Sequence, residues 1–319
     1  MPTSARPTRT TDTRPSPADR RRAAAVEREA AARRAARRRT RQRWAIGTAA
    51  ALAVAGGATF LAVRGGDEAG SAAAPVVGGD LHTLTSIGDA LYVGGHAAVA
   101  VSRDGGRAWE QVPSLEDADA MGWAQTSDDL LLGGHPGLFR STDGGASFTP
   151  VTGDGAVPDV HALGAAGVTV YVGSPQAGLM VSEDGGDSWE TRNAEAGRSF
   201  MGTILVDPAD PQRLLAPDMS SGLLASSDGG RRWTPLGGPE GAMAAAWDPT
   251  DFTRIVVVGM SESAISADGG QTWEPLAVPA GTSAATFSAD GTTIYTAALD
   301  GETAVTSAST DGGRTWNLL

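Results

Sequence analysis

The chain has no cysteine and no lysine among its 319 residues, and aromatic residues make up only 5% of it. The absence of cysteine excludes disulfide bonds, so any folded domain must be stabilised by packing alone. Histidine occurs four times and tyrosine three times. Because these residue types are scarce, the places where they occur carry most of the information about function.

Positive and negative charge are separated along the chain. Residues 1–43 contain 14 arginines and four acidic residues, whereas residues 64–319 contain 11 arginines and 33 acidic residues. The net charge of −12 therefore hides a basic arm attached to an acidic domain. We expect this arm to be disordered over residues 1–18, which are rich in Pro, Thr and Arg, and helical from there to residue 43.

An uncharged stretch, Trp44–Val63, follows the basic arm. A helix of about 20 residues matches the roughly 30 Å hydrocarbon core of a bilayer. Arginines directly before it predict a cytoplasmic N-terminus, and so a single-pass protein of the cell membrane with an extracytoplasmic domain. The alternative is a cleaved signal peptide, but the basic region before it is unusually long. A cytoplasmic flank explains the arm's charge, so we expect no nucleic acid partner. Residues 64–79 are predicted to be a flexible linker.

Six copies of the motif S-x-D-G-G-x-x-W/F occur at nearly even intervals. Their first serines are separated by 39, 41, 44, 40 and 43 residues. A period near 40 residues with one turn signal per unit is typical of a repeat protein. The copies are Ser102–Trp109, Ser141–Phe148, Ser182–Trp189, Ser226–Trp233, Ser266–Trp273 and Ser309–Trp316.

The motif has the composition of a tight turn between two strands. Glycine adopts positive φ without steric cost, and the aspartate can accept hydrogen bonds from backbone N–H groups just ahead of it. The aromatic residue can bury a large apolar area. We therefore assign the six aspartates a structural role rather than a catalytic one. They are Asp104, Asp143, Asp184, Asp228, Asp268 and Asp311.

This motif resembles the Asp-box, or BNR repeat, of sialidases and other β-propellers, including sortilin-type receptors and a photosystem assembly factor. The resemblance covers residues 80–319. It implies an all-β fold, namely a six-bladed β-propeller of four-stranded Asp-box repeats. We expect a single N-terminal transmembrane helix at residues 44–63 to precede this propeller. It does not imply one activity. The repeats are expected at about 80–116, 117–156, 157–197, 198–239, 240–280 and 281–319.

The first repeat shows the predicted blade layout. We expect its strands at Leu81–Ile87, Ala90–Gly94, Ala98–Ser102 and Ala108–Val112, with the motif turn between the last two. We further expect Pro75–Val77 to pair with a terminal blade and so to close the ring. Segments around Gly133–Gly137 and Asp159–Leu163 also resemble bacterial membrane-anchored Asp-box proteins named glycosyl hydrolases.

Two positions of each repeat are predicted to lie on one face of the propeller. In a four-stranded meander the first strand begins, and the second ends, at the same edge of the sheet. We call this face, opposite the motif turns, the ligand face. All four histidines and five of the methionines fall at these two positions. They are His82, Met121, His161, Met201 and Met243 at the first, and His96, His135, Met219 and Met260 at the second.

Histidine and thioether groups in a thiol-free extracytoplasmic protein suit a soft metal, copper above all. The candidate metal ligands are His82, His96, His135 and His161, with Asp80 and Asp159 as ligands or outer partners. The alternative is that the methionines fill the core and the histidines are structural. No pair of histidines has the spacing of a local metal motif, so the metal hypothesis depends on the predicted fold. A metal, a glycan and a protein are the ligand classes that we expect for this face.

Enzymatic function is the other possibility that the resemblance raises. Sialidases use an arginine triad, a tyrosine paired with a glutamate, and a Phe/Tyr-Arg-Ile-Pro sequence, which is absent here. The three tyrosines fall in predicted second strands, so sialidase chemistry is not expected. A hydrolase using two carboxylates stays open, with catalytic candidates Asp80, Asp119 and Asp159 on the ligand face. Glu116 and Asp117 lie beside them.

The sequence thus favours a membrane-anchored extracytoplasmic Asp-box propeller that acts as a ligand-binding or assembly platform. The first alternative is a glycoside hydrolase of sialidase-like fold without the sialidase catalytic set. The second is a copper-binding protein that uses the histidines and methionines of the ligand face.

Overall fold

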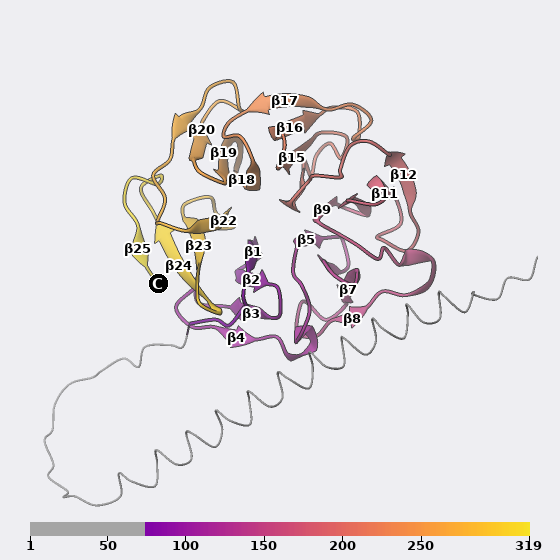
Figure 1. Cartoon of the computed structure of the whole chain (residues 1–319), viewed down its shortest axis with the longest axis horizontal. Coiled ribbons are helices and arrows are strands. Elements are labelled where there is room, and N and C mark those ends of the chain that lie inside the picture. The colour runs from indigo at the N-terminus through magenta and orange to yellow at the C-terminus, as the bar shows by residue number, and fades with distance from the viewer. Residues whose placement is uncertain (1–73) are drawn as a thin grey trace, which may run out of the picture. The chain divides into compact units, whose positions relative to one another are not determined.

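A computed structural model describes residues 74–319, which form six sheets arranged as a ring (Figure 1). Each sheet is one blade, and the blades follow one another around the ring in chain order. The basic arm and the predicted membrane span at residues 44–63 lie outside the described residues. Within residues 74–319 there is no helix both long and apolar enough to cross a bilayer.

The six blades contain 25 strands and two short 3₁₀ helices. The first three blades comprise β1 (Leu81–Ile87), β2 (Ala90–Gly95), β3 (Val99–Ser102), β4 (Glu110–Gln111), η1 (Pro113–Leu115), β5 (Gly122–Gln125), β6 (Leu130–Gly133), β7 (Leu138–Ser141), β8 (Thr149–Pro150), η2 (Gly153–Gly155), β9 (Ala162–Ala166), β10 (Thr169–Ser174), β11 (Gly178–Ser182) and β12 (Glu190–Asn193). The last three comprise β13 (Gly202–Thr203), β14 (Leu205–Val206), β15 (Leu214–Asp218), β16 (Gly222–Ser226), β17 (Thr234–Gly237), β18 (Ala242–Asp248), β19 (Asp251–Gly259), β20 (Ser263–Ser266), β21 (Glu274–Pro275), β22 (Thr282–Phe287), β23 (Ile294–Asp300), β24 (Thr303–Ser309) and β25 (Asn317–Leu318).

Each blade is a meander whose first strand lies nearest the centre of the ring (Figure 1). The predicted six blades of four strands are confirmed. The outermost strand is shorter than expected in the first blade, because the backbone N–H of Ala108 is still bonded to Asp104 inside the turn. In the fourth blade the inner strand is interrupted, and β13 pairs in parallel with β9 of the third blade.

The hydrophobic core lies between the blades rather than within them. Each of the six apolar clusters contains residues from two adjacent blades. In one of them Tyr92 of the first blade stacks on Trp123 of the second, with ring centroids 4.8 Å apart, and Phe148 packs edge-on against Trp123 at 5.8 Å. Phe148 is the aromatic residue of the second motif, so the repeat supplies this interface directly.

The ring closes between the first and the sixth blade. As predicted, the segment Pro75–Val77 pairs with the sixth blade: Val76 forms a bridge with Thr303, and Val77 N–H donates to Glu302 O at 2.9 Å. Val77 is fully buried in the cluster shared by the two blades. The ends of the described chain are therefore joined by backbone hydrogen bonds as well as by packing.

All six motif turns have the same hydrogen bonds. The serine hydroxyl donates to the aspartate Oδ1 at 2.6–3.0 Å and accepts from the second glycine N–H at 2.8–2.9 Å. The same Oδ1 accepts a backbone N–H four residues ahead at 2.9 Å. Both glycines have positive φ throughout. The carboxylates are thus occupied in the turns, as their predicted structural role requires.

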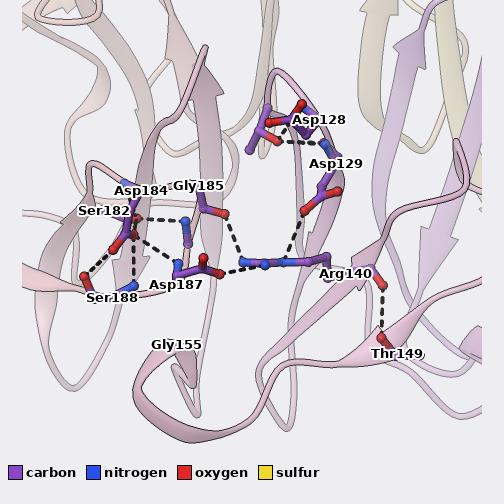
Figure 2. A network of polar contacts seen from close by, with 12 residues as sticks. Asp128, Asp129, Arg140, Thr149, Gly155, Ser182, Asp184, Gly185, Asp187 and Ser188 are labelled. Atoms are coloured by element: carbon purple, nitrogen blue, oxygen red, sulfur yellow. Dashed lines mark hydrogen bonds and ion pairs between the residues drawn. The ribbon is translucent and has the colours of Figure 1, made fainter.

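An arginine ties the second blade to the turn of the third (Figure 2). Arg140 on β7 donates to Asp187 Oδ1 at 2.7 Å and to Gly185 O at 3.0 Å, and its Nε lies 3.6 Å from Asp129 Oδ2. Arg192 similarly donates to Gly229 O in the next turn at 3.2 Å. These contacts lie on the face of the motif turns, away from the ligand face, and we assign them to blade alignment.

Acid should destabilise the propeller through these turns. Hydrogen bonds from Ser147 and Thr272 lower the pKa of Asp143 and Asp268 from the ordinary 3.8 to about 2. The folded state therefore binds fewer protons than the unfolded state, so the stabilisation is complete above about pH 4 and is lost as pH falls through about 2. Urea midpoints measured from pH 5 to pH 2 should fall over this range, and a flat profile would contradict the assignment. The Asp143→Asn/Asp268→Asn variant should show a smaller drop.

Candidate functional site

The structure brings the four histidines together at one edge of the first three blades. His82 lies in β1, His96 and His135 follow β2 and β6, and His161 directly precedes β9. The rings of His82 and His96 have centroids 6.4 Å apart, and those of His135 and His161 are 5.2 Å apart. Each pair lies beside an aspartate that precedes the inner strand of a blade.

Asp119 lies at the centre of this cluster and is only 5% exposed. Its Oδ1 lies 3.3 Å from His82 Nε2, and its Oδ2 lies 3.6 Å from His96 Nδ1. The same Oδ2 pairs with His135 Nδ1 in a hydrogen bond of 2.8 Å. In this pair we assign the ring nitrogen as the donor and the carboxylate oxygen as the acceptor. Asp119 thus links two histidines of the first blade to His135, which belongs to the second blade like Asp119 itself.

Asp159 repeats this arrangement one blade further on and is 9% exposed. Its Oδ1 lies 3.2 Å from His161 Nε2 and 2.8 Å from His135 Nε2. Its Oδ2 accepts a hydrogen bond from Gln176 Nε2 at 3.3 Å. His135 therefore stands between two carboxylates, with one ring nitrogen toward each. We call His82, His96, Asp119, His135, Asp159 and His161 the His/Asp cluster.

The cluster shifts the protonation of two histidines in opposite directions. The hydrogen bond to Asp119 raises the pKa of His135 above its ordinary 6.5, against the effect of burial and with help from the Asp159 charge. Burial lowers the pKa of His161, although the Asp159 charge opposes this. Burial thus favours the neutral form of His161, in which one ring nitrogen carries a lone pair.

Two glycines allow the histidine-bearing loops to approach the aspartates. Gly95 and Gly134 directly precede His96 and His135. A Cβ at Gly95 would lie 1.9 Å from the Asp80 carbonyl oxygen, and one at Gly134 would lie 1.6 Å from that of Asp119. Any side chain would push the loop away from the inner strand, so the glycines are a local cause of the cluster's geometry.

The other predicted site residues lie around this cluster or apart from it. Asp80 has a side chain that is 66% exposed, 3.9 Å from His82 Nε2. Met121 is buried, Met201 and Met243 are half-buried, and Met219 and Met260 are exposed on the fourth and fifth blades. Each of the two triads of possible metal ligands in the described residues consists of two imidazoles and one carboxylate.

Sequence reasoning did not anticipate two features of the site. The first is the role of Asp119. The sequence predicts it as a catalytic candidate, whereas the structure shows it as the partner of three histidines. Its repeat position, which it shares with Asp80 and Asp159, is the signal that could have indicated this role. The second is Gln176. Neither motif nor period marks it, because it lies in the loop between the second and third strands, and its side chain reaches Asp159 only in the folded blade.

Comparisons with known proteins agree with this architecture. The sequence profile of the BNR/Asp-box repeat matches residues 264–275, which include the fifth motif. The chain is a six-bladed β-propeller with Asp-box repeats. No curated protein matches it significantly.

Several solved structures resemble this Asp-box propeller. The GH74 xyloglucanase of Xanthomonas campestris superposes with a TM-score of 0.51 at 16% identity, over 77% of this chain and 46% of that one. YCF48 bound to D1 peptide gives 0.50 at 20% identity, over 77% and 84%. PorZ, a surface component of the type IX secretion system of Porphyromonas gingivalis, gives 0.50 at 10%, over 78% and 39%. This chain spans less than half of the xyloglucanase, and such identities show the fold alone.

Replacing Gly134 with alanine should disrupt the site and destabilise the propeller. The added methyl group would overlap the Asp119 carbonyl oxygen, and overpacking of this kind costs roughly 1–3 kcal/mol. Gly79→Ala is the matched control, because a Cβ there meets nothing within 4 Å. Its effect should stay within about 0.5 kcal/mol. Equal free energies of urea unfolding for the two variants would contradict the close approach.

Proposed function

We propose that the protein is a membrane-anchored propeller that binds a ligand through the His/Asp cluster on its extracytoplasmic ligand face. The observation that carries this proposal is the convergence of all four histidines of the chain, from three different blades, on two buried aspartates. A buried carboxylate costs folding free energy unless it is partnered, and the side chains of His96 and His135 are exposed on the same face, so we interpret the cluster as a binding site rather than as a stabilising feature.

Hydrolysis of a glycoside is supported less well by the same geometry. Hydrolases with two carboxylates place them on either side of the scissile bond, about 5–9.5 Å apart, with sugar or water between them. Here the His135 ring fills the space between Asp119 and Asp159, with one nitrogen 2.8 Å from each. A sugar has no room between these two groups while His135 holds this position. The likeness to a GH74 xyloglucanase carries only the fold.

A protein or peptide is a suitable class of ligand for such a face. YCF48, a propeller of similar size, was solved bound to D1 peptide, so a ring of these dimensions can present a peptide-binding surface. The exposed Met219 and Met260 flank the cluster's face on the fourth and fifth blades, and methionine adapts to varied apolar partners. We propose an assembly role of this kind, with the anchor at residues 44–63 holding the platform at the membrane.

The proposed topology predicts where a reporter joined to Leu319 is active. Alkaline phosphatase folds with disulfides and is active only outside the cytoplasm, so the fusion should be active in intact cells. Deleting residues 44–63 should abolish that activity and release the fusion from carbonate-washed membranes. Activity that survives the deletion, or a wild-type fusion without activity, would contradict the anchor.

The platform predicts a difference between the two faces. A photo-crosslinking residue at Met219, which is 43% exposed on the ligand face, should capture the partner in cells. The same residue at Val168, which is 48% exposed on the face of the Asp-box turns, is the control and should capture nothing. Products of equal yield from both positions, or from neither, would contradict a ligand face.

A further inference from the structure

The His/Asp cluster divides into two triads that each suit a metal ion. His82, His96 and Asp119 form the first, and His135, His161 and Asp159 the second; within each triad three ligand atoms lie within 4.8 Å of one another. Each triad combines two imidazoles with one carboxylate. Three protein ligands are the pattern of zinc sites that keep a fourth position for water or another ligand, whereas closed structural sites use four protein ligands.

One oxygen in each triad is buried without a hydrogen bond. Asp119 Oδ1 and Asp159 Oδ1 are both inaccessible to solvent and accept none, although the Asp119 side chain is only 6% exposed and the Asp159 side chain only 12%. Imidazole nitrogens lie close to both, at 3.3 Å from Asp119 Oδ1 and at 2.8 and 3.2 Å from Asp159 Oδ1. Such a carboxylate is costly to bury. Nitrogen and oxygen atoms that lie close together around a buried oxygen without a hydrogen bond to it are the arrangement expected of ligands to one metal ion.

The separations of these atoms agree with the geometry of a coordinated metal. Zinc binds imidazole nitrogen and carboxylate oxygen at about 2.0–2.2 Å, which places neighbouring tetrahedral ligands roughly 3.3–3.6 Å apart. Asp119 Oδ1 lies 3.3 Å from His82 Nε2, and Asp159 Oδ1 lies 3.2 Å from His161 Nε2. The 2.8 Å between Asp159 Oδ1 and His135 Nε2 is shorter, and would lengthen slightly on binding.

Outer hydrogen bonds already orient the second triad. His135 is held through Nδ1 by Asp119 Oδ2, which leaves Nε2 free to bind. The second oxygen of Asp159 is held by Gln176. Carboxylate–histidine pairs of this kind fix the tautomer and orientation of metal-bound imidazoles. Asp119 therefore serves both triads, with Oδ1 as a ligand in the first and Oδ2 as the outer partner of His135 in the second.

We infer that the His/Asp cluster binds two divalent ions of the zinc class, one in each triad, coupled through the Asp119–His135 hydrogen bond. This inference rests on the proposed ligand face and names the ions that bind there. Nitrogen and oxygen donors suit Zn²⁺ and similar divalent ions, whereas Cu⁺ prefers sulfur. The exposed sulfur of Met260 belongs to the fifth blade, outside both triads. Two doubly charged ions on two carboxylates leave a net positive centre, whose open positions would accept an anionic group of the partner.

Zinc titration of the full-length chain in detergent tests this inference. After removal of metal with a chelator, calorimetric titration should show two equivalents of Zn²⁺, and Co²⁺ should give the visible absorption of low-coordinate sites. Asp159→Asn and His82→Ala should each retain one equivalent. In each variant the zinc affinity of the altered triad should fall by more than the roughly 10- to 100-fold loss that removal of an outer partner causes. Zinc should also raise the thermal midpoint of the wild type.

Two controls separate the triads from their surroundings. Met260→Leu should retain two equivalents with unchanged affinity, because Met260 belongs to neither triad. Asp80→Asn should also retain two equivalents, with a loss of affinity no larger than that of an outer partner, because its carboxylate lies 3.9 Å from His82 Nε2. A wild type that binds one equivalent or none would overturn the inference, as would unchanged zinc binding by an Asp119→Asn/Asp159→Asn variant. Circular dichroism of the metal-free variants shows whether they are folded. Crosslinking at Met219 is measured separately, so a negative zinc titration would overturn the metal centre without overturning the proposed binding platform.

Discussion

The structure depends on the fact that no blade can bury its own apolar faces. A four-stranded sheet has two faces, and in this propeller each is covered only by the neighbouring blade. Stability without a disulfide therefore requires that every interface, including the one between the last blade and the first, be present at once. The Asp-box turns contribute to the same end, because they place an aromatic residue from each repeat at an interface.

Much of this architecture follows from the period of the sequence. The spacing of the Asp-box motifs predicts the number of blades, their strands and the face on which His82, His96, His135 and His161 gather, because pairing within a meander is local. The contacts of Asp119 and Asp159 could not be predicted in the same way. They join different blades, and their distances depend on the curvature of the ring and on the loops after Gly95 and Gly134, which no periodicity specifies.

The six blades share a scaffold but differ in chemistry. The position of Asp119 and Asp159 carries Ser199 in the fourth blade, where its hydroxyl donates to Asp218 at 2.5 Å. Glycine and threonine occupy it in the last two blades. Repetition thus supplies equivalent places around the ring, and substitution at a few of them confines the histidines to one sector. The exposed Met219 and Met260 lie in the remaining sector, so the two halves of the ligand face carry different side chains.

The segment that closes the ring is also the segment that leads to the rest of the chain. Residues 75–77 are hydrogen-bonded to the sixth blade, and the preceding residues continue from there toward the N-terminus. Any pulling force on that end reaches the propeller first at the joint between its two terminal blades, where an isolated bridge from Val76 to Thr303 and a backbone hydrogen bond from Val77 to Glu302 meet it. Those few contacts, rather than the average stability of a blade, are the first that such a force would have to break.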